Sequence, residues 1–145
     1  MSIEDKSVTP EVTEEWIRAA LVSHGTAELT VRGSCMTPAL IEGERVKLME
    51  PGRPARLGDI VLIRTLGGLR LHRVVFRARE NVRTKGDHGT YLDPVTPASR
   101  IIAVCAIEES PAVRMARTAR SVLRLARRWS AGRVVRDEAH VRLLP

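Results

Sequence analysis

The stretch that decides the fold is GDIVLIRTLGGLRLHRVVFR, residues 58–77. Its first part, DIVLIRT, is a short apolar run with high β-propensity, and its second part, LRLHRVV, alternates in the manner of a half-buried strand. Between them, Leu66-Gly67-Gly68 has the length and glycine content of a hairpin turn. The sequence therefore predicts two antiparallel strands joined by a tight turn.

Four further β-prone runs surround this hairpin, and segments containing glycine or proline separate them. The runs are ELTVRG, RVKLME, NVRTKG and RIIAVCAI. Ahead of them, Thr9-Pro10 followed by glutamates predicts a helix from about Pro10 to Ser23, which His24-Gly25 ends. We therefore expect a mainly β fold with flanking helices: an N-terminal helical segment (1–26), a β domain (27–109), and a C-terminal helix and tail (110–145).

The excess positive charge lies in one segment. Residues 1–109 hold 15 basic and 15 acidic side chains, whereas residues 110–145 hold nine arginines and two acidic residues and so carry the whole net charge of +7. Within this segment a helix is predicted from Ser110-Pro111 to about Ser130, with arginines on one arc and apolar residues on the opposite arc. The arginines are Arg114, Arg117, Arg120, Arg124, Arg127 and Arg128, and the apolar residues are Met115, Ala119, Val122, Leu125, Ala126 and Trp129.

Two arrangements of this helix are open. In the first, which the alanine spacing favours, the apolar stripe packs on the β body and the basic face stays in water. In the second, the helix docks on an anionic membrane surface or an acidic partner. Nucleic acid is not an expected partner, because the chain has only four aromatic residues for stacking and no helix-turn-helix pattern before the β body.

The remaining composition bears on the compartment. No run of about 18 apolar residues is present, and the acidic N-terminal stretch MSIEDKSVTPEVTEEW has no apolar segment of the signal-peptide type. We therefore expect a cytoplasmic protein, peripheral at the membrane if the last helix docks there. In a reducing compartment Cys35 and Cys105 are expected to be free thiols, and without CxxC or paired-histidine spacing no metal or cofactor is predicted.

Three motifs follow one another along the chain. They are GSCMTPAL (33–40), Gly58-Asp59 with the LHRVV strand that follows, and VRTKGDHGTYLDPV (82–95). Together they resemble the signal peptidase family, within the wider clan that includes the self-cleaving repressors. The histidine in LHRVV, followed by KGD and a later aspartate, resembles the archaeal and endoplasmic-reticulum branch, which uses His and Asp in place of a lysine base. The resemblance implies a coiled antiparallel β body of the signal peptidase type.

Carried onto this chain, the resemblance makes Cys35 the nucleophile, His72 the general base and Asp93 the acid that orients the histidine. Cys35 stands where the family has a serine. A thiol close to a histidine can form a nucleophilic thiolate–imidazolium pair, so acyl transfer remains chemically possible after the replacement.

Other residues of the motifs receive supporting roles. Asp87 is the second acidic position of that branch and is expected to support the loop geometry. Ser34 is expected near the oxyanion but cannot replace the nucleophile, because adjacent residues on an extended backbone point in different directions. Met36 and Pro38 are expected to contact the substrate. Cys105 lies in an apolar run and is expected in the core.

The resemblance predicts a soluble endopeptidase that cleaves a peptide or protein precursor, such as a leader peptide, or cleaves itself. One alternative is an inactive homologue whose groove binds peptides, and another is a docking module acting through the basic helix. Without the resemblance, the same residues read as ordinary structure: Cys35 as a small buried turn residue, His72 as a strand side chain and Asp93 as a turn former before Pro94.

Overall fold

The computed structural model describes the backbone of residues 10–130 and the side chains of residues 13–127. Within this range the chain is mainly antiparallel β with a helix at either end, as the sequence predicts. The helices are α1 (Pro10–His24) and α2 (Pro111–Ser130); the strands are β1 (Thr26–Thr30), β2 (Arg45–Met49), β3 (Ile60–Thr65), β4 (Gly68–Ala78), β5 (Asn81–Lys85), β6 (Thr96–Pro97) and β7 (Ile101–Cys105).

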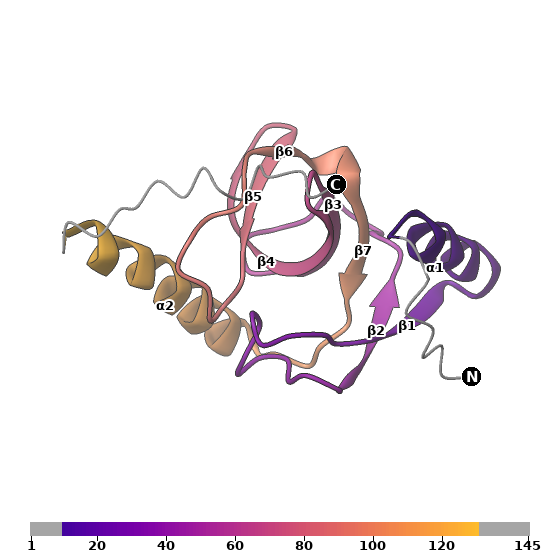
Figure 1. Ribbon diagram of the computed structural model, residues 1–145, viewed down its shortest axis with the longest axis horizontal. Coiled ribbons are helices and arrows are strands. Elements are labelled where there is room, and N and C mark those ends of the chain that lie inside the picture. The colour runs from indigo at the N-terminus through magenta and orange to yellow at the C-terminus, as the bar shows by residue number, and fades with distance from the viewer. Residues whose placement is uncertain (1–9, 131–145) are drawn as a thin grey trace, which may run out of the picture.

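All of these strands belong to one sheet, in the order β1-β2-β7-β3-β4-β5-β6. β3 lies at its centre, and its residues from Ile60 to Ile63 are all buried because both faces of the strand are covered. β3 pairs with β4 through the predicted hairpin, in which Thr65 is opposite Gly68 and Gly68 takes a φ of +101°. β4 is long and curved, so the sheet coils, with α1 and α2 on opposite sides of it (Figure 1).

The coiled sheet has an apolar core on each side of β3. One core joins α1 to the sheet, since Ile17 and Leu21 pack with Leu62 and its neighbours. The other core consists of Ala55, Val61, Ile63, Val74 and Val82. Because successive β3 side chains point to opposite faces, this one strand contributes to both cores. The N-terminal helix is thus packed into the same body as the strands.

The structure adds one short strand to the six that the sequence predicts. β6 has two residues and pairs with Asn81 and Val82 of β5, and the 3₁₀ turn Ala98–Arg100 follows it. Its sequence, TP, lies in a segment predicted to be a loop. A strand of two residues is too short to show an alternating pattern. Its proline also lacks a backbone N–H and is confined to sheet edges, so the sequence gives no sign of a strand here.

Polar contacts fix the side of α2 that faces the sheet. Arg114 forms an ion pair with Asp59 at 3.4 Å, and Arg117 forms one with Glu109 at 2.5 Å. Gly58 packs so closely on the helix that a Cβ at this position would lie 2.6 Å from Cγ of Arg114. Two arginines of the predicted solvent-facing arc therefore attach the helix to the body, and they are not free for a partner.

The apolar stripe that we expected against the body is mostly exposed instead. Among its described members Leu125 is half-buried, and the exposed ones are Met115, Ala119, Val122 and Ala126. The expectation was wrong because periodicity shows that two faces of a helix differ, but not which of them the body covers. The side chains of Arg128 and Trp129, and the predicted tail at 131–145, lie outside the described residues.

Candidate active site

Cys35 lies in the loop between β1 and β2, which two buried side chains anchor. Met36 and Leu40 are 1% and 0% exposed, and the backbone N–H of Leu40 donates to the Met36 carbonyl at 3.0 Å. A second turn bond joins the N–H of Thr37 to the carbonyl of Ser34 at 3.1 Å. Cys35 itself is exposed. The alternative of a small buried turn residue is therefore wrong for this cysteine.

His72 projects from β4 and is only 3% exposed. Its Nδ1 lies 2.5 Å from Oδ2 of Asp93, and its ring lines the same cavity as Cys35 and interacts with that thiol. Because Asp93 occupies Nδ1, Nε2 is the nitrogen left for the thiol. Burial alone would lower the pKa of His72, but the hydrogen bonds with Asp93 and Cys35 outweigh it and raise the pKa to about 9. The imidazole is therefore cationic at neutral pH.

Asp93 is held in place by Thr84 of β5. The backbone N–H of Asp93 donates to the Thr84 carbonyl at 2.9 Å, and the Thr84 hydroxyl donates to Oδ2 of Asp93 at 2.7 Å. Burial acts to raise the pKa of Asp93, but the hydrogen bond from His72 outweighs it and keeps the pKa below its usual range. An ionised carboxylate in this position fixes the tautomer and the orientation of His72.

The two cysteines occupy opposite environments. The hydrogen bond with His72 lowers the pKa of the Cys35 thiol, against the opposing effect of partial burial. Cys105 is buried on β7, and that burial raises its pKa to about 11. A thiol with a lowered pKa beside a cationic imidazole favours a thiolate–imidazolium pair, which Cys105 has no means of forming.

A cavity of about 330 Å³ opens beside Cys35 and His72. α1, β1 and the β3–β4 hairpin form its walls. Its apolar lining residues are Ile17, Leu29, Val31, Met36, Leu62, Leu69 and Leu71. Arg70 also lines it, and its positive charge adds to the effect of His72 in lowering the pKa values of Cys35 and Asp93. The cavity thus offers apolar surface with a cation near the thiol.

The loop that follows β5 packs against the backbone of Cys35. The backbone N–H of His88 donates to the carbonyl of Cys35 at 2.9 Å. A Cβ on Gly86 would lie 2.7 Å from that carbonyl oxygen and 3.1 Å from Cβ of Cys35. Only a glycine at position 86 therefore allows this loop to approach Cys35 so closely.

Replacing Gly86 with alanine is expected to push Cys35 away from His72. Displacements of this kind reduce the reactivity of an oriented group by about 10- to 100-fold. The measurement is the rate of Cys35 alkylation by iodoacetamide at pH 7. Gly89→Ala is the matched control, because its added Cβ would meet the Gly86 carbonyl oxygen at an ordinary 3.4 Å. Equal rates in the two variants would show that the close approach of Gly86 does not position the thiol.

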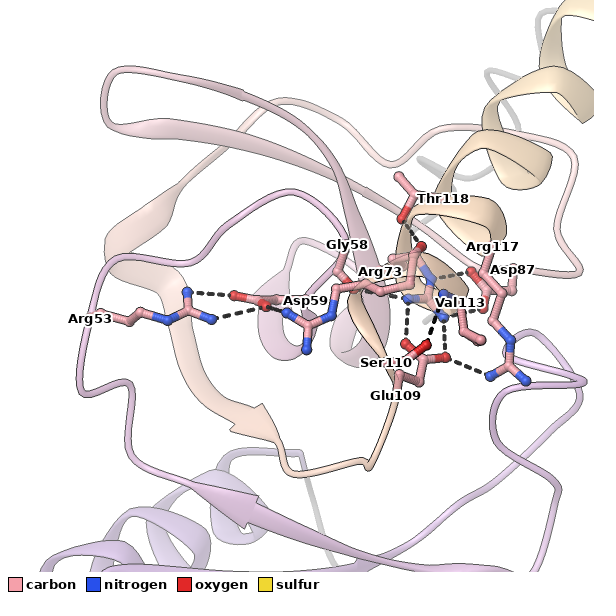
Figure 2. A network of polar contacts seen from close by, with 11 residues as sticks. Arg53, Gly58, Asp59, Arg73, Asp87, Glu109, Ser110, Val113, Arg117 and Thr118 are labelled. Carbon is pink, nitrogen blue, oxygen red and sulfur yellow. Dashed lines mark hydrogen bonds and ion pairs between the residues drawn. The ribbon is translucent and has the colours of Figure 1, made fainter.

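Asp87 pairs with Arg73 of β4 (Figure 2). Its carboxylate accepts hydrogen bonds from Nε and Nη2 of Arg73 at 2.8 and 2.7 Å. Arg73 is fully buried and also reaches Glu109, at 3.0 Å. These contacts connect the loop that follows β5 to β4 and to the segment before α2.

The other predicted site residues lie around the nucleophile loop. Met36 lines the cavity, although it is almost wholly buried. Pro38 follows a cis peptide bond, is exposed, and is not among the residues that line this cavity. Ser34 is exposed next to Cys35. The structure thus brings together the three predicted catalytic residues and one of the two predicted substrate contacts.

Three contributors to the site have no role predicted from the sequence. Thr84 and Gly86 belong to the TKGD motif, whose spacing is informative but whose individual contacts are not. Arg70 is two residues before His72 on the same strand, and the period of two along a strand is the signal that could have found it. Each acts through a contact or an electrostatic effect between residues distant in sequence.

Comparison with models of known protein families, with curated proteins and with solved structures gives no match for this chain. Within residues 10–130, neither helix combines the length and apolar character needed to cross a bilayer. The geometry itself gives an exposed thiol, a histidine at the same cavity, and a carboxylate on the Nδ1 of that histidine. That arrangement is the one that nucleophilic acyl transfer requires.

Proposed function

We propose that this chain is a thiol endopeptidase resembling the His/Asp branch of the signal peptidases, and that it cleaves a peptide or protein precursor in the cytoplasm. One observation carries the proposal: His72 binds Asp93 through Nδ1 and lines the same apolar cavity as the exposed thiol of Cys35, with which it interacts. Three motifs far apart in sequence supply these residues. A lowered thiol pKa beside a raised imidazole pKa is typical of a functional site.

The reaction begins with the thiolate of Cys35, whose proton resides on His72. Sγ attacks the carbonyl carbon of the scissile bond, and the backbone N–H of Cys35 stabilises the oxyanion that forms. His72 then gives its proton to the leaving amine as the C–N bond breaks, which leaves a thioester on Cys35. Neutral His72 next takes a proton from water, and the hydroxide releases the acid product and regenerates the thiolate. Asp93 keeps Nδ1 protonated throughout.

The cavity suggests the kind of peptide that would bind. Its apolar walls suit small or aliphatic side chains on an extended segment, which the resemblance also implies. Arg70 lines the cavity and brings a positive charge to it, so a nearby acidic side chain on the substrate would be favoured. A leader segment with small apolar residues beside a carboxylate is the substrate class that we propose.

Alkylation with iodoacetamide across pH tests the activated thiol. Because the pKa of Cys35 is lowered, its thiolate is expected to persist below the ordinary thiol range, so labelling at pH 7 should be faster than that of an ordinary thiol. In His72→Ala the labelling rate should follow an ordinary thiol, with a pKa of about 8.5. Cys105 is the internal control, since its pKa of about 11 keeps it unreactive.

A pool of peptides analysed by mass spectrometry separates the enzyme from a silent peptide-binding homologue. Cleavage by the wild type that is lost in both Cys35→Ala and His72→Ala supports the peptidase. Rapid labelling of Cys35 without cleavage, accompanied by peptide binding, would favour the binding protein. Labelling in the ordinary thiol range in the wild type would overturn the proposal.

A further inference from the structure

α2 presents a continuous apolar face to solvent. Its larger exposed side chains are Val113 (43%), Met115 (57%), Val122 (42%) and Leu123 (58%), and the exposed alanines beside them are Ala112, Ala116, Ala119 and Ala126. At 100° per residue, all of these except Val113 fall within one arc of about 120°. Soluble monomers seldom leave so long an apolar stripe uncovered, so this face is a candidate interaction surface.

The orientation of this face is fixed by the contacts on the other side of the helix. Ser121 is buried and accepts a hydrogen bond from Nζ of Lys85 at 2.9 Å. Nearer the start of the helix, Arg114 pairs with Asp59 and Arg117 pairs with Glu109, and the second of these ion pairs is seen in Figure 2. Rolling the helix to bury its apolar stripe would break these polar contacts and leave Lys85 buried without a side-chain partner. The stripe is therefore held outward by the fold itself.

The charge of α2 indicates what would cover the stripe. The helix has six arginines and no acidic residue between Pro111 and Ser130, and Arg120 is exposed at the edge of the stripe. Two copies meeting along this face would bring two strongly cationic helices together, which electrostatic repulsion opposes. An apolar stripe bordered by arginine is instead the pattern of a helix that lies in the interface of an anionic bilayer.

We propose that the outward face of α2 binds the surface of an anionic membrane, with Met115, Val122 and Leu123 at the boundary between headgroups and acyl chains and Arg120 at the phosphates. This differs from docking through the basic face, because two of the arginines of that face are held in ion pairs with the body. The inference is independent of the chemistry at Cys35.

Co-sedimentation of the full chain with vesicles tests the proposal. The wild type should pellet with vesicles of phosphatidylcholine and phosphatidylglycerol, and much less with phosphatidylcholine alone. Met115→Glu with Leu123→Glu should weaken binding by at least about tenfold, because two carboxylates enter the stripe. Leu66→Glu is the matched control: Leu66 is 93% exposed on the β3–β4 turn, and its replacement should leave binding unchanged. Circular dichroism checks that each variant is folded.

Several results would overturn the proposal. Unchanged vesicle binding in the double variant would place the contact outside the stripe. Equal binding to neutral vesicles would remove the role of the anionic headgroup. A concentration-dependent dimer that the double variant abolishes, with no vesicle binding by the wild type, would show that a second copy covers the face. Binding to soluble polyglutamate in place of vesicles would identify an acidic protein partner and would also contradict it.

Discussion

Replacing Arg73 with methionine is expected to lower the free energy of unfolding by about 3–5 kcal/mol, the usual cost of removing one partner from a buried ion pair. Arg73 is fully buried and serves two carboxylates, with Nη2 2.7 Å from Asp87 and Nη1 3.0 Å from Glu109. Its Nη1 also donates to the carbonyl of Gly58 at 2.9 Å. The variant leaves two acidic groups in the interior. Glu109 keeps its ion pair with the partly exposed Arg117, whereas Asp87 loses both hydrogen bonds from Arg73.

Urea unfolding measures this change in the free energy of unfolding. Two further variants test whether the change comes from the unpaired buried carboxylates. Arg100→Met removes the same charge from an exposed position and should change stability by no more than about 0.5 kcal/mol. Combining Arg73→Met with Asp87→Leu and Glu109→Met removes the unpaired carboxylates and should recover most of the loss. If Arg73→Met cost no more than the Arg100 control, the network in Figure 2 would contribute little to the fold.

The part of the fold that the sequence predicts well is the part that local rules determine. The β3–β4 hairpin follows from an apolar run, a glycine turn and an alternating run that are adjacent in the chain. α1 begins at Pro10 and gives way to Gly25, which has a φ of +70°, for equally local reasons. Hydrogen bonds within a few residues of each other carry these features, so a single sequence is enough to anticipate them.

The orientation of α2 could not be predicted, because its contacts are with residues far away in sequence. Asp59 pairs with Arg114 across 55 positions, and Lys85 reaches Ser121 across 36. Burying a polar helix face is favourable only where such partners exist. The pattern of the helix alone favours burying its apolar side, so the true arrangement requires knowledge of the surface beneath it.

The candidate site falls between these two cases. The motifs identified Cys35, His72 and Asp93. The structure brings these residues together through the β4–β5 pairing and the loop that follows β5. Thr84 is placed by a backbone hydrogen bond of 2.9 Å from Asp93, and Gly86 by a close approach to Cys35 that leaves no room for a Cβ. No spacing rule encodes either contact. Sequence reasoning could therefore name the candidate reacting groups but not the residues that hold them.

Replacing Asp93 with asparagine is expected to reduce kcat for peptide cleavage by about 10⁴-fold, as loss of the orienting carboxylate does in other triads. The amide side chain of this variant would have no negative charge to balance the imidazolium, so the pKa of His72 should fall from about 9 toward or below its ordinary value. The Cys35 thiolate would then lose its cationic partner, and its pKa should rise. The amide could also donate to Nδ1 and favour the wrong tautomer.

Two readouts make this prediction specific to orientation of the imidazole. One is cleavage of a peptide that the wild type cuts, and the other is the pH profile of Cys35 alkylation, which should shift toward the ordinary thiol range. Glu80→Gln neutralises an exposed carboxylate on the β4–β5 turn and should alter neither. Because Thr84 also binds Asp93, Thr84→Val should show a smaller change in the same direction. Full activity in Asp93→Asn, with activity lost in His72→Ala, would mean that His72 acts without an orienting acid.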